Sequence, residues 1–403
     1  MALFDSNGFF IKPGAWLGLL GGGQLGKMFC NSAQQLGYKV VVIDPSNDNP
    51  ASSVADLHLQ SSYDDEDVLN HFSSICKAVT VEFENVPVHS LSFLAKKKVR
   101  VCPSYESIAI AQNRILEKEF ISSLGIDLAP YAVLYDYEDC DNISDNLFPG
   151  ILKVAQLGYD GKGQIRVKDK GQLKKAFDDL GKVPSVFEKM LSLDQEVSIV
   201  VARDLNGNTK EFPPSINFHT SGILSSSIIT SSNHEIYSNI DISRVSFIAK
   251  KIVESLKYSG VLCIEFFIIG NRIIVNEIAP RPHNSGHYSI EACITSQFEQ
   301  QVRAMVGLPL GDTSLMSSAI MINLLGDVWF DKSNGLQREP NWVKVLNISG
   351  TKLHLYGKNE ARIGRKMGHI TLLGNDVYEL NKRAYDVCSV MGINYESVES
   401  KSW

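Results

Sequence analysis

Residues 261–278 read VLCIEFFIIGNRIIVNEI, two apolar runs that a glycine and an asparagine separate. Their length, their β-branched and aromatic residues and the glycine between them are typical of two strands joined as a hairpin. Each run also contains one carboxylate, Glu265 in the first and Glu277 in the second. A buried carboxylate is costly unless it is paired or bound to a cation, so both are candidate functional residues. Pairing of one glutamate with a basic residue such as Lys189 is the structural alternative.

The register of this hairpin decides whether the two glutamates meet. A three-residue loop at 270–272 would pair Ile269 with Ile273. Glu265 would then lie directly opposite Glu277 on one face, whereas a two-residue loop would turn them to opposite faces. Facing carboxylates repel unless a cation lies between them, and hard oxygen ligands completed by phosphate oxygens suit Mg2+. We therefore expect the first register, with Glu265 and Glu277 as ligands of Mg2+, or of Mn2+ in its place.

Polar and basic residues follow the hairpin immediately. Residues 279–287 read APRPHNSGH, and Asn276 stands just before Glu277. Arginine, histidine and asparagine side chains beside a metal can hold an anionic intermediate and stabilise the charge that develops during phosphoryl transfer. A single histidine is more often structural, but His283 and His287 both fall within this short loop. The loop therefore predicts a site for an anion next to the metal.

The N-terminal part has the pattern of a parallel α/β sheet. Residues 15–26 read AWLGLLGGGQLG, a helical pattern follows, and the strand KVVVID ends at Asp44. This order is that of a βαβ unit, and further strands are predicted at 78–83 and 98–103. The glycines at 21, 23 and 26, with Asp44, satisfy a dinucleotide-binding pattern. The pattern is weak, because glycines also allow a tight turn and close helix packing, so phosphate binding is plausible here and NAD is not expected.

From about residue 130 the sequence pattern changes to short predicted strands separated by glycine and proline. A helix is predicted over 241–260. Between two of the strands lies GYDGKGQ (158–164), whose three glycines allow the backbone to close over phosphates while Lys162 supplies charge. Lys153 in the preceding strand could contact an α-phosphate with its positive charge. Each feature has a plain alternative, because Asp-Gly is a common hairpin turn and a lysine in a strand usually snorkels from an edge.

Composition limits these interpretations. At 403 residues the chain is too long for one compact core, and its 44% hydrophobic and 21% charged residues are ordinary for a globular protein. A net charge of −6 argues against a binder of nucleic acid or acidic membranes, and no apolar run reaches transmembrane length. Seven scattered cysteines without a C-x-x-C pair suggest neither a disulfide framework nor a zinc site. Without a signal peptide, they favour the reducing cytoplasm.

Together these motifs resemble those of the ATP-grasp superfamily and, within it, the N5-carboxyaminoimidazole ribonucleotide synthetases, the ATPase components of phosphoribosylaminoimidazole carboxylase. The resemblance runs from about residue 16 to about residue 390, and its last three motifs in combination are highly specific. The motifs are GGGQLGKM (21–28), VEFENV (81–86), AQNRILEK (111–118), GYDGKGQ (158–164), FEKM (187–190), NEIAPRPHNSGH (276–287) and LYGKNEARIGRKMGHI (355–370).

The resemblance implies an α/β and α+β multidomain chain. The implied parts are a Rossmann-like pre-ATP-grasp domain over 1–110, an ATP-grasp domain over 111–310 and a small β-rich C-terminal domain over 311–403. A lid subdomain would occupy about 131–192. ATP would lie between the two antiparallel sheets of the central domain.

The resemblance also implies roles for individual residues. Contacts to the nucleotide would come from Arg114, Lys153, Gly158, Tyr159, Asp160, Gly161, Lys162, Gly163, Gln164, Glu188, Lys189, Met190, Leu191, Glu196, His219, Asn276 and Glu277. Contacts to 5-aminoimidazole ribonucleotide would come from Gln24, Leu25, Glu82, Asp160, Lys358 and Arg365. Bicarbonate and carboxyphosphate would be held by Arg281, His283 and Asn284. The implied catalytic residues are Asp160, Arg281, His283, Asn284 and Lys358, beside the metal ligands Glu265 and Glu277.

The implied reaction is the ATP-dependent carboxylation of 5-aminoimidazole ribonucleotide in de novo purine biosynthesis. Bicarbonate would attack the γ-phosphoryl group to give carboxyphosphate and ADP. Carboxyphosphate, or CO2 released from it, would be captured by the exocyclic amine while the lid excludes water. The expected partners are these small molecules, a second copy of the chain in a homodimer, and a separate mutase that receives the product. Neither nucleic acid nor a membrane is expected as a partner.

The sequence departs from the family pattern at two places, and other functions compete. Residues 215–219 read SINFH where the family often has Glu-Asn before the histidine, and Leu157 stands where glycine is common. A formate-dependent glycinamide ribonucleotide transformylase would share the glycine turn and the metal pair, but the segment at 355–370 favours the carboxylase. An NAD-dependent oxidoreductase would explain only the first glycine motif. An inactive ATP-binding regulator is disfavoured because the expected metal and phosphate ligands are all present.

Overall fold

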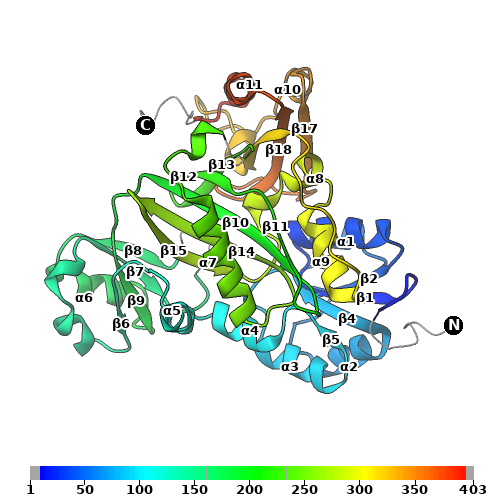
Figure 1. Cartoon of the computed structure of the whole chain (residues 1–403), viewed down its shortest axis with the longest axis horizontal. Coiled ribbons are helices and arrows are strands. Elements are labelled where there is room, and N and C mark those ends of the chain that lie inside the picture. Colours follow the sequence, from blue (N-terminus) through cyan, green and yellow to red (C-terminus); the bar gives the residue numbers. More distant parts are fainter. Residues whose placement is uncertain (1–9, 159–161, 232–233, 396–403) are drawn as a thin grey trace.

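A computed structural model describes residues 10–158, 162–231 and 234–395 of the chain (Figure 1). Its strands form three sheets of five, four and nine strands. None of the helices within these ranges is long and apolar enough to cross a membrane.

The N-terminal part is a five-stranded parallel sheet in the order β3-β2-β1-β4-β5, which confirms the predicted βαβ pattern. The apolar strands are buried because helices cover both faces of the sheet. The strand order reverses at β1, so a crevice forms at the carboxyl ends of β1 and β4, where sheets of this kind bind ligands. The elements are β1 (Trp16–Leu20), α1 (Gln24–Gln35), β2 (Lys39–Ile43), β3 (Leu57–Leu59), α2 (Glu66–Ile75), β4 (Cys76–Val81), α3 (Val88–Lys96) and β5 (Arg100–Val101).

The next part is a four-stranded antiparallel sheet in the order β6-β9-β7-β8, at the left of Figure 1. Helix α6 packs on it through Leu173 and Phe177, which join a core with Leu152 and Phe187. Helices α4 and α5 connect this sheet to the N-terminal part. The elements are α4 (Tyr105–Ala111), α5 (Arg114–Ser123), β6 (Tyr131–Leu134), β7 (Gly150–Val154), β8 (Gln164–Val167), α6 (Lys170–Asp179) and β9 (Ser185–Lys189).

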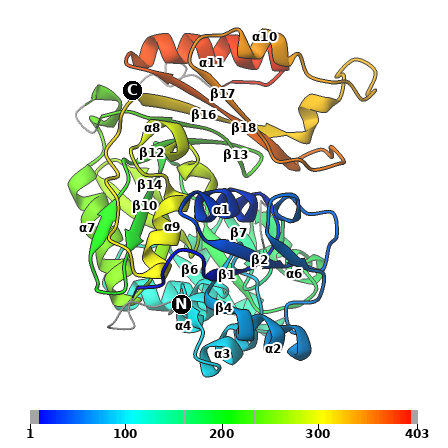
Figure 2. The same ribbon diagram turned by 90° about the vertical axis from the view of Figure 1, so that its right-hand side faces the viewer.

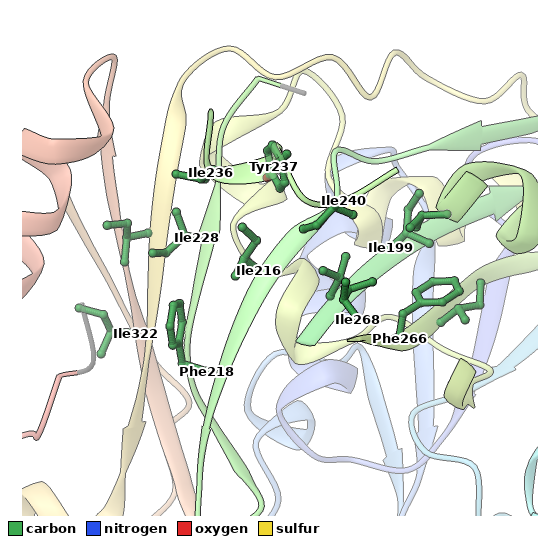
Figure 3. Close-up of a cluster of buried hydrophobic side chains, with 14 of the residues drawn as sticks. Ile199, Ile216, Phe218, Ile228, Ile236, Tyr237, Ile240, Phe266, Ile268 and Ile322 are labelled. Carbon is green, nitrogen blue, oxygen red and sulfur yellow. The ribbon is translucent and has the colours of Figure 1, made fainter. Parts of the chain in front are cut away.

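The largest sheet has nine strands along the path β15-β14-β10-β12-β13-β16-β18-β17, with β11 paired to β10. Helix α7 covers one face, where isoleucine, valine and phenylalanine side chains form the cluster drawn in Figure 3. Helix α9 packs instead into the core of the N-terminal sheet through Phe298, Val302 and Met305. The elements are β10 (Gln195–Arg203), β11 (Thr209–Glu211), β12 (Ser215–Thr220), β13 (Ile223–Ile229), α7 (Ile242–Ser255), β14 (Gly260–Ile269), β15 (Arg272–Ala279), α8 (Ser289–Ala292) and α9 (Gln297–Val306).

The C-terminal part continues this sheet with β16 (Ser318–Leu325), β18 (Lys366–Gly374) and β17 (Thr351–Leu355), and Figure 2 shows it as a layer at the top of the view. It also contains α10 (Trp342–Leu346) and the fifteen-residue helix α11 (Val377–Met391). The expected β-rich part therefore also contains two helices, which the sequence analysis did not predict. Asp376 caps α11 by accepting bonds from the first-turn amides, and Gly392 ends it with a φ of +73°.

The hairpin β14–β15 corrects the predicted loop but retains the predicted pairing. Ile269 pairs with Arg272, so the loop has two residues rather than three. A two-residue loop alone would turn the glutamates to opposite faces, but a β-bulge places Asn276 as an extra residue on β15. Glu265 therefore pairs with Glu277 after all. The extra residue shifts the alternation by one position, which is the known effect of a bulge.

Candidate functional site

A cavity of about 900 Å3 lies between the four-stranded sheet, the nine-stranded sheet and the carboxyl ends of β1 and β4. The structure brings together in its wall most of the residues that the sequence singled out. These are Gln24, Leu25, Glu82, Arg114, Lys153, Gly158, Lys162, Gln164, Glu188, Lys189, Met190, Leu191, Glu196, His219, Glu265, Asn276, Glu277, Arg281, His283 and Asn284.

Six expected residues are not among those that the structure places in this wall. Tyr159, Asp160 and Gly161 lie outside the described residues, so their predicted roles stay predictions. Gly163, Lys358 and Arg365 are described, but other residues line the cavity. Lys358 donates from Nζ to the carbonyl oxygen of Lys366 at 2.7 Å. Burial raises the pKa of the Glu82 carboxyl, and the charges of Arg281 and Lys358 oppose that rise.

Glu265 and Glu277 form an acidic pair on the cavity wall. Burial, and then the charge of Glu277, raise the pKa of Glu265. Glu277 accepts a bond at 3.0 Å from Nη1 of Arg114. Asn276, on the bulge between them, donates to Glu265 at 3.4 Å, while its buried Oδ1 has no partner among the described residues. Excess negative charge and unused oxygen ligands at one place fit a divalent cation.

The protein alone does not complete a metal site here. Within the described ranges, no three His, Cys, Asp or Glu side chains gather as a group that could hold a metal ion. A pair of carboxylates is nevertheless the usual protein share of an Mg2+ site whose other ligands are water and substrate phosphates. The residues present therefore fit Mg2+ that binds together with a phosphorylated substrate.

Glu188 on β9 faces the same cavity, but its neighbours are two lysines rather than another carboxylate. Its carboxylate lies 3.1 Å from Nζ of Lys118 and 3.0 Å from Nζ of Lys153. Although burial opposes the shift, the charges of Lys153 and Lys118 lower the pKa of Glu188 to about 2. Lys153 lines the cavity and Lys118 does not. Glu188 thus holds Lys153 at the wall, where the lysine can meet an anion.

Two further glutamates support the site, and the sequence analysis quoted their motifs without assigning them a role. Glu117 on α5 accepts the backbone N–H of Ile278 at 2.6 Å, directly after Glu277. Burial raises the pKa of Glu117 to about 7, although Arg114 opposes this rise. Glu84 follows β4 and binds Arg281. In the sequence, each is only a charged residue within a helix or just after a strand. Such residues are too common to indicate a partner far along the chain.

The loop after the hairpin presents its polar groups to the cavity. Arg281 donates from Nε to Glu84 at 2.6 Å, and although burial opposes the shift, Arg281 lowers the pKa of Glu84. His283 turns Nε2 toward Oε1 of Glu265 at 3.5 Å, and burial lowers the pKa of His283 well below its usual value. The amide of Asn284 is buried, and neither its nitrogen nor its oxygen has a partner among the described residues. An unsatisfied buried amide in a cavity wall fits a ligand that supplies the missing bonds.

Glu196 on β10 and His219 on β12 form a second pair on the wall, with 2.7 Å between Oε2 and Nδ1. Burial opposes the shift, but the nearby carboxylate of Glu196 raises the pKa of His219. The departure from the family pattern at 215–218 leaves this pair in place, because His219 itself still faces the cavity.

Two carboxylates of the chain accept bonds from three amides of the glycine turn after β1. The backbone N–H of Gly22 donates to Asp44 at 2.7 Å, and those of Gly23 and Leu25 donate to Glu82 at 2.9 and 3.2 Å. A side chain at Gly23 would come within 2.2 Å of the Glu82 carboxylate. The glycines are needed for this close approach, and two carboxylates occupy the helix N-terminus that would otherwise attract phosphate. Phosphate binding at this turn stays a prediction, and these bonds leave fewer amides for it.

Leu157, where the family often has glycine, has a φ of +64°. Only glycine adopts this left-handed region readily, and a leucine there costs on the order of 1 kcal/mol. The backbone before the glycine loop thus retains the conformation that glycine favours, even though the residue has changed.

Comparison with known proteins gives a consistent result along the whole chain. Three family models match: the ribonucleotide synthetase preATP-grasp domain at 15–112, the ATP-grasp domain at 119–298 and the phosphoribosylaminoimidazole carboxylase C-terminal domain at 319–383. The N5-carboxyaminoimidazole ribonucleotide synthase of Bacillus subtilis is 39% identical over 365 residues, which is 90% of this chain and 92% of that protein.

Solved structures agree with the sequence comparison. The ADP complex of N5-carboxyaminoimidazole synthetase from Staphylococcus aureus superposes with a TM-score of 0.85 at 36% identity, covering 97% of this chain and all of the other (100%). N5-carboxyaminoimidazole synthase from Aspergillus clavatus, in complex with ADP and 5-aminoimidazole ribonucleotide, superposes with a TM-score of 0.83 at 27% identity. The match covers 94% of this chain and 99% of the other.

Proposed function

This chain belongs to the N5-carboxyaminoimidazole ribonucleotide synthase family of ATP-grasp enzymes, and we propose how its own residues perform the reaction. The activity is the ATP-dependent synthesis of N5-carboxyaminoimidazole ribonucleotide from 5-aminoimidazole ribonucleotide and bicarbonate in purine biosynthesis. The observation that carries the proposal is the cavity in which the acidic pair, the Arg281–Asn284 loop and the crevice at β1 and β4 share one wall.

The nucleotide lies between the two antiparallel sheets. Lys153, held by Glu188, contacts its phosphates, while Lys189, Met190 and Leu191 on the same wall also contact the nucleotide. Glu265 and Glu277 would hold Mg2+, which would supply positive charge to balance the phosphate oxygens. Mn2+ is expected to substitute because it takes the same oxygen ligands. Arg114 donates to Glu277 through Nη1, and its other N–H groups can donate to a phosphate of the nucleotide.

Bicarbonate lies beside the acidic pair, where Arg281, His283 and the unsatisfied amide of Asn284 hold it and then carboxyphosphate. Glu84 sets the guanidinium of Arg281 by its bond to Nε. Preorganised donors stabilise the anion as its charge develops. The aminoimidazole ribonucleotide enters at Gln24, Leu25 and Glu82, with Lys358 and Arg365 closing from the C-terminal part and Asp160 steering the amine.

The wider biological setting is also proposed here. The chain works in the cytoplasm, in keeping with seven cysteines that are all free and buried. It acts as a homodimer, and its product passes to a separate mutase.

The activity and its substrates can be tested together by measuring ADP release with Mg-ATP, with and without the aminoimidazole ribonucleotide, in the presence of bicarbonate or formate. We expect ADP release only when the ribonucleotide and bicarbonate are both present. Stimulation by formate with glycinamide ribonucleotide instead would identify the transformylase. Failure of the aminoimidazole to stimulate ADP release would overturn the assigned acceptor.

A further inference from the structure

A row of polar side chains lies buried behind the loop that carries His283. Ser198 on β10, Asn217 on β12 and Ser227 on β13 stand side by side on neighbouring strands, and at most 4% of each residue is exposed. Side chains alternate along a strand, so the residues next to them face the other side of the sheet. Those neighbours belong to the apolar cluster labelled in Figure 3, including Ile199, Ile216, Phe218 and Ile228.

Polar groups at such positions require hydrogen bonds, because an unpaired buried hydroxyl or amide is costly. Ser227 donates from Oγ to Oδ1 of Asn217 at 2.8 Å. Asn217 donates from Nδ2 to Oγ of Ser198 at 2.9 Å. Ser198 donates to Oγ of Ser285 at 2.7 Å, and that oxygen lies 2.9 Å from Nδ1 of His283. The row is therefore a continuous chain of bonds that ends on the catalytic loop.

The direction of the last bond is set by a group that cannot reverse. The backbone N–H of Ser285 also points at Nδ1 of His283, with 3.3 Å between the nitrogens. A backbone amide only donates, so Nδ1 must accept. A neutral imidazole whose Nδ1 accepts carries its proton on Nε2. That nitrogen is the one that faces Glu265 and the cavity.

We propose that Ser285, oriented by the row Ser198–Asn217–Ser227, is a positioning residue that fixes His283 as an Nε2–H donor toward the bicarbonate-derived anion. This inference rests on the proposed role of His283 at that anion. A donor whose tautomer and ring plane are already set needs no reorganisation as the anion forms. The reverse tautomer would place an N–H on Nδ1 against the amide of Ser285, so the folded loop excludes it.

The tautomer can be read directly from the full-length protein labelled with 15N-histidine. Two-bond 1H–15N correlation spectra distinguish protonated from unprotonated ring nitrogens, and the signals of His283 are assigned by their loss in His283→Gln. We expect the Nε2–H pattern for His283 in the wild type and also in Ser285→Ala, because this variant keeps the backbone amide that donates to Nδ1. An Nδ1–H pattern in the wild type would overturn the proposal.

Kinetics test whether this orientation matters for the reaction. In Ser285→Ala and in Ser198→Ala, which lies one step further from the site, we expect kcat/KM for bicarbonate to fall about tenfold, the usual effect of one lost buried hydrogen bond. The KM values for ATP and for the ribonucleotide should stay unchanged. An equal rise in all three KM values would mean a structural effect and would refute the positioning role.

Ser226→Ala is the matched control. Ser226 is also a buried serine on β13, next to Ser227, but its Oγ has no hydrogen-bond partner in the described part of the chain. We expect its kinetics to match those of the wild type. A tenfold loss of kcat/KM for bicarbonate in this variant would show that any buried serine of β13 affects the site. The positioning role of the row would then be refuted.

A pair of substitutions at His283 separates this proposal from the proposed function. The amide nitrogen of glutamine reaches the place of Nε2, whereas that of asparagine reaches the place of Nδ1. We expect His283→Gln to retain at least tenfold more bicarbonate-dependent ADP formation than His283→Asn. Full activity in both would remove His283 from the anion site, while the reverse order with reduced activity would keep the anion site and refute the Nε2–H donor.

Discussion

Two glutamates face the same cavity from different sheets, and the protein balances their charges differently. Glu188 on β9 lies between two lysines at 3.0 and 3.1 Å, and its pKa falls to about 2. Glu265 on β14 pairs with another glutamate, and its pKa rises. A carboxylate whose charge the protein already balances can position a neighbour, here Lys153. An acidic pair left with excess charge is suited to a cation that arrives with the substrate.

The largest expected effect comes from the acidic pair. Glu277→Gln removes a metal-ligating oxygen charge while it keeps the shape of the side chain, so we expect turnover to fall by at least about 10^3-fold, or more than about 4 kcal/mol in activation free energy. The fold should remain intact, because removing one of two repelling carboxylates relieves the hairpin. ADP release and circular dichroism measure the two outcomes. Near-normal activity would show that Glu277 holds no catalytic metal.

At Glu188, whose charge two lysines balance, a glutamate-to-glutamine substitution should lower the stability of the fold. Glu188→Gln leaves Lys118, whose side chain is 2% exposed, with a buried unpaired charge, so we expect the free energy of unfolding to fall by about 3 kcal/mol. Urea titrations measure the change. Asp141→Asn is the control, because it breaks the exposed pair with Lys174, and exposed pairs contribute less than about 1 kcal/mol. Equal losses in the two variants would contradict the comparison.

The two lysines of Glu188 should divide into a structural and a functional partner. Lys153→Met removes a charge from the cavity wall, so we expect the KM for ATP to rise about tenfold with a smaller loss of stability. Lys118→Met, away from the wall, should lower stability and leave the KM for ATP close to normal. Steady-state kinetics and thermal unfolding of both variants measure this. A raised KM for ATP in Lys118→Met, without loss of stability, would reverse the assignment.

Local patterns predicted much of this arrangement, because the βαβ unit, the hairpin and the loop after it each follow from adjacent residues. The bulge at Asn276 was not predicted, since nothing in the local sequence of the hairpin indicated an extra residue in β15. The bond from Glu117 to the amide of Ile278 and the row from Ser227 to Ser285 join residues far apart in the sequence. Single serines and glutamates do not indicate their distant partners, so these contacts required the structure.

The glycine turn shows another contact that its local pattern did not indicate. Glycines before a helix can expose amides to an anion. In this structure the carboxylates of Asp44 and Glu82, which follow β2 and β4, already accept bonds from the turn. Asp44 was part of the glycine pattern, but nothing local showed that its carboxylate binds the turn itself.

The smallest expected effect is a pH dependence of opposite sign at the two glutamates, measured in metal-free protein. The pKa of Glu188 is about 2 in the folded state against 4.5 for an ordinary glutamate. Its contribution to stability is therefore present above pH 4.5 and declines below it by about 1.4 kcal/mol per pH unit. Glu265 has a pKa above the ordinary value, so its contribution is present below pH 4.5 and declines as the pH rises. Urea titrations in EDTA should show the disadvantage of Glu188→Gln relative to the wild type shrinking from pH 5 to pH 3. Glu265→Gln should instead become more favourable relative to the wild type from pH 5 to pH 8. If both variants followed the wild type in parallel over these ranges, the two carboxylates would be equally balanced, and the contrast between them would be wrong.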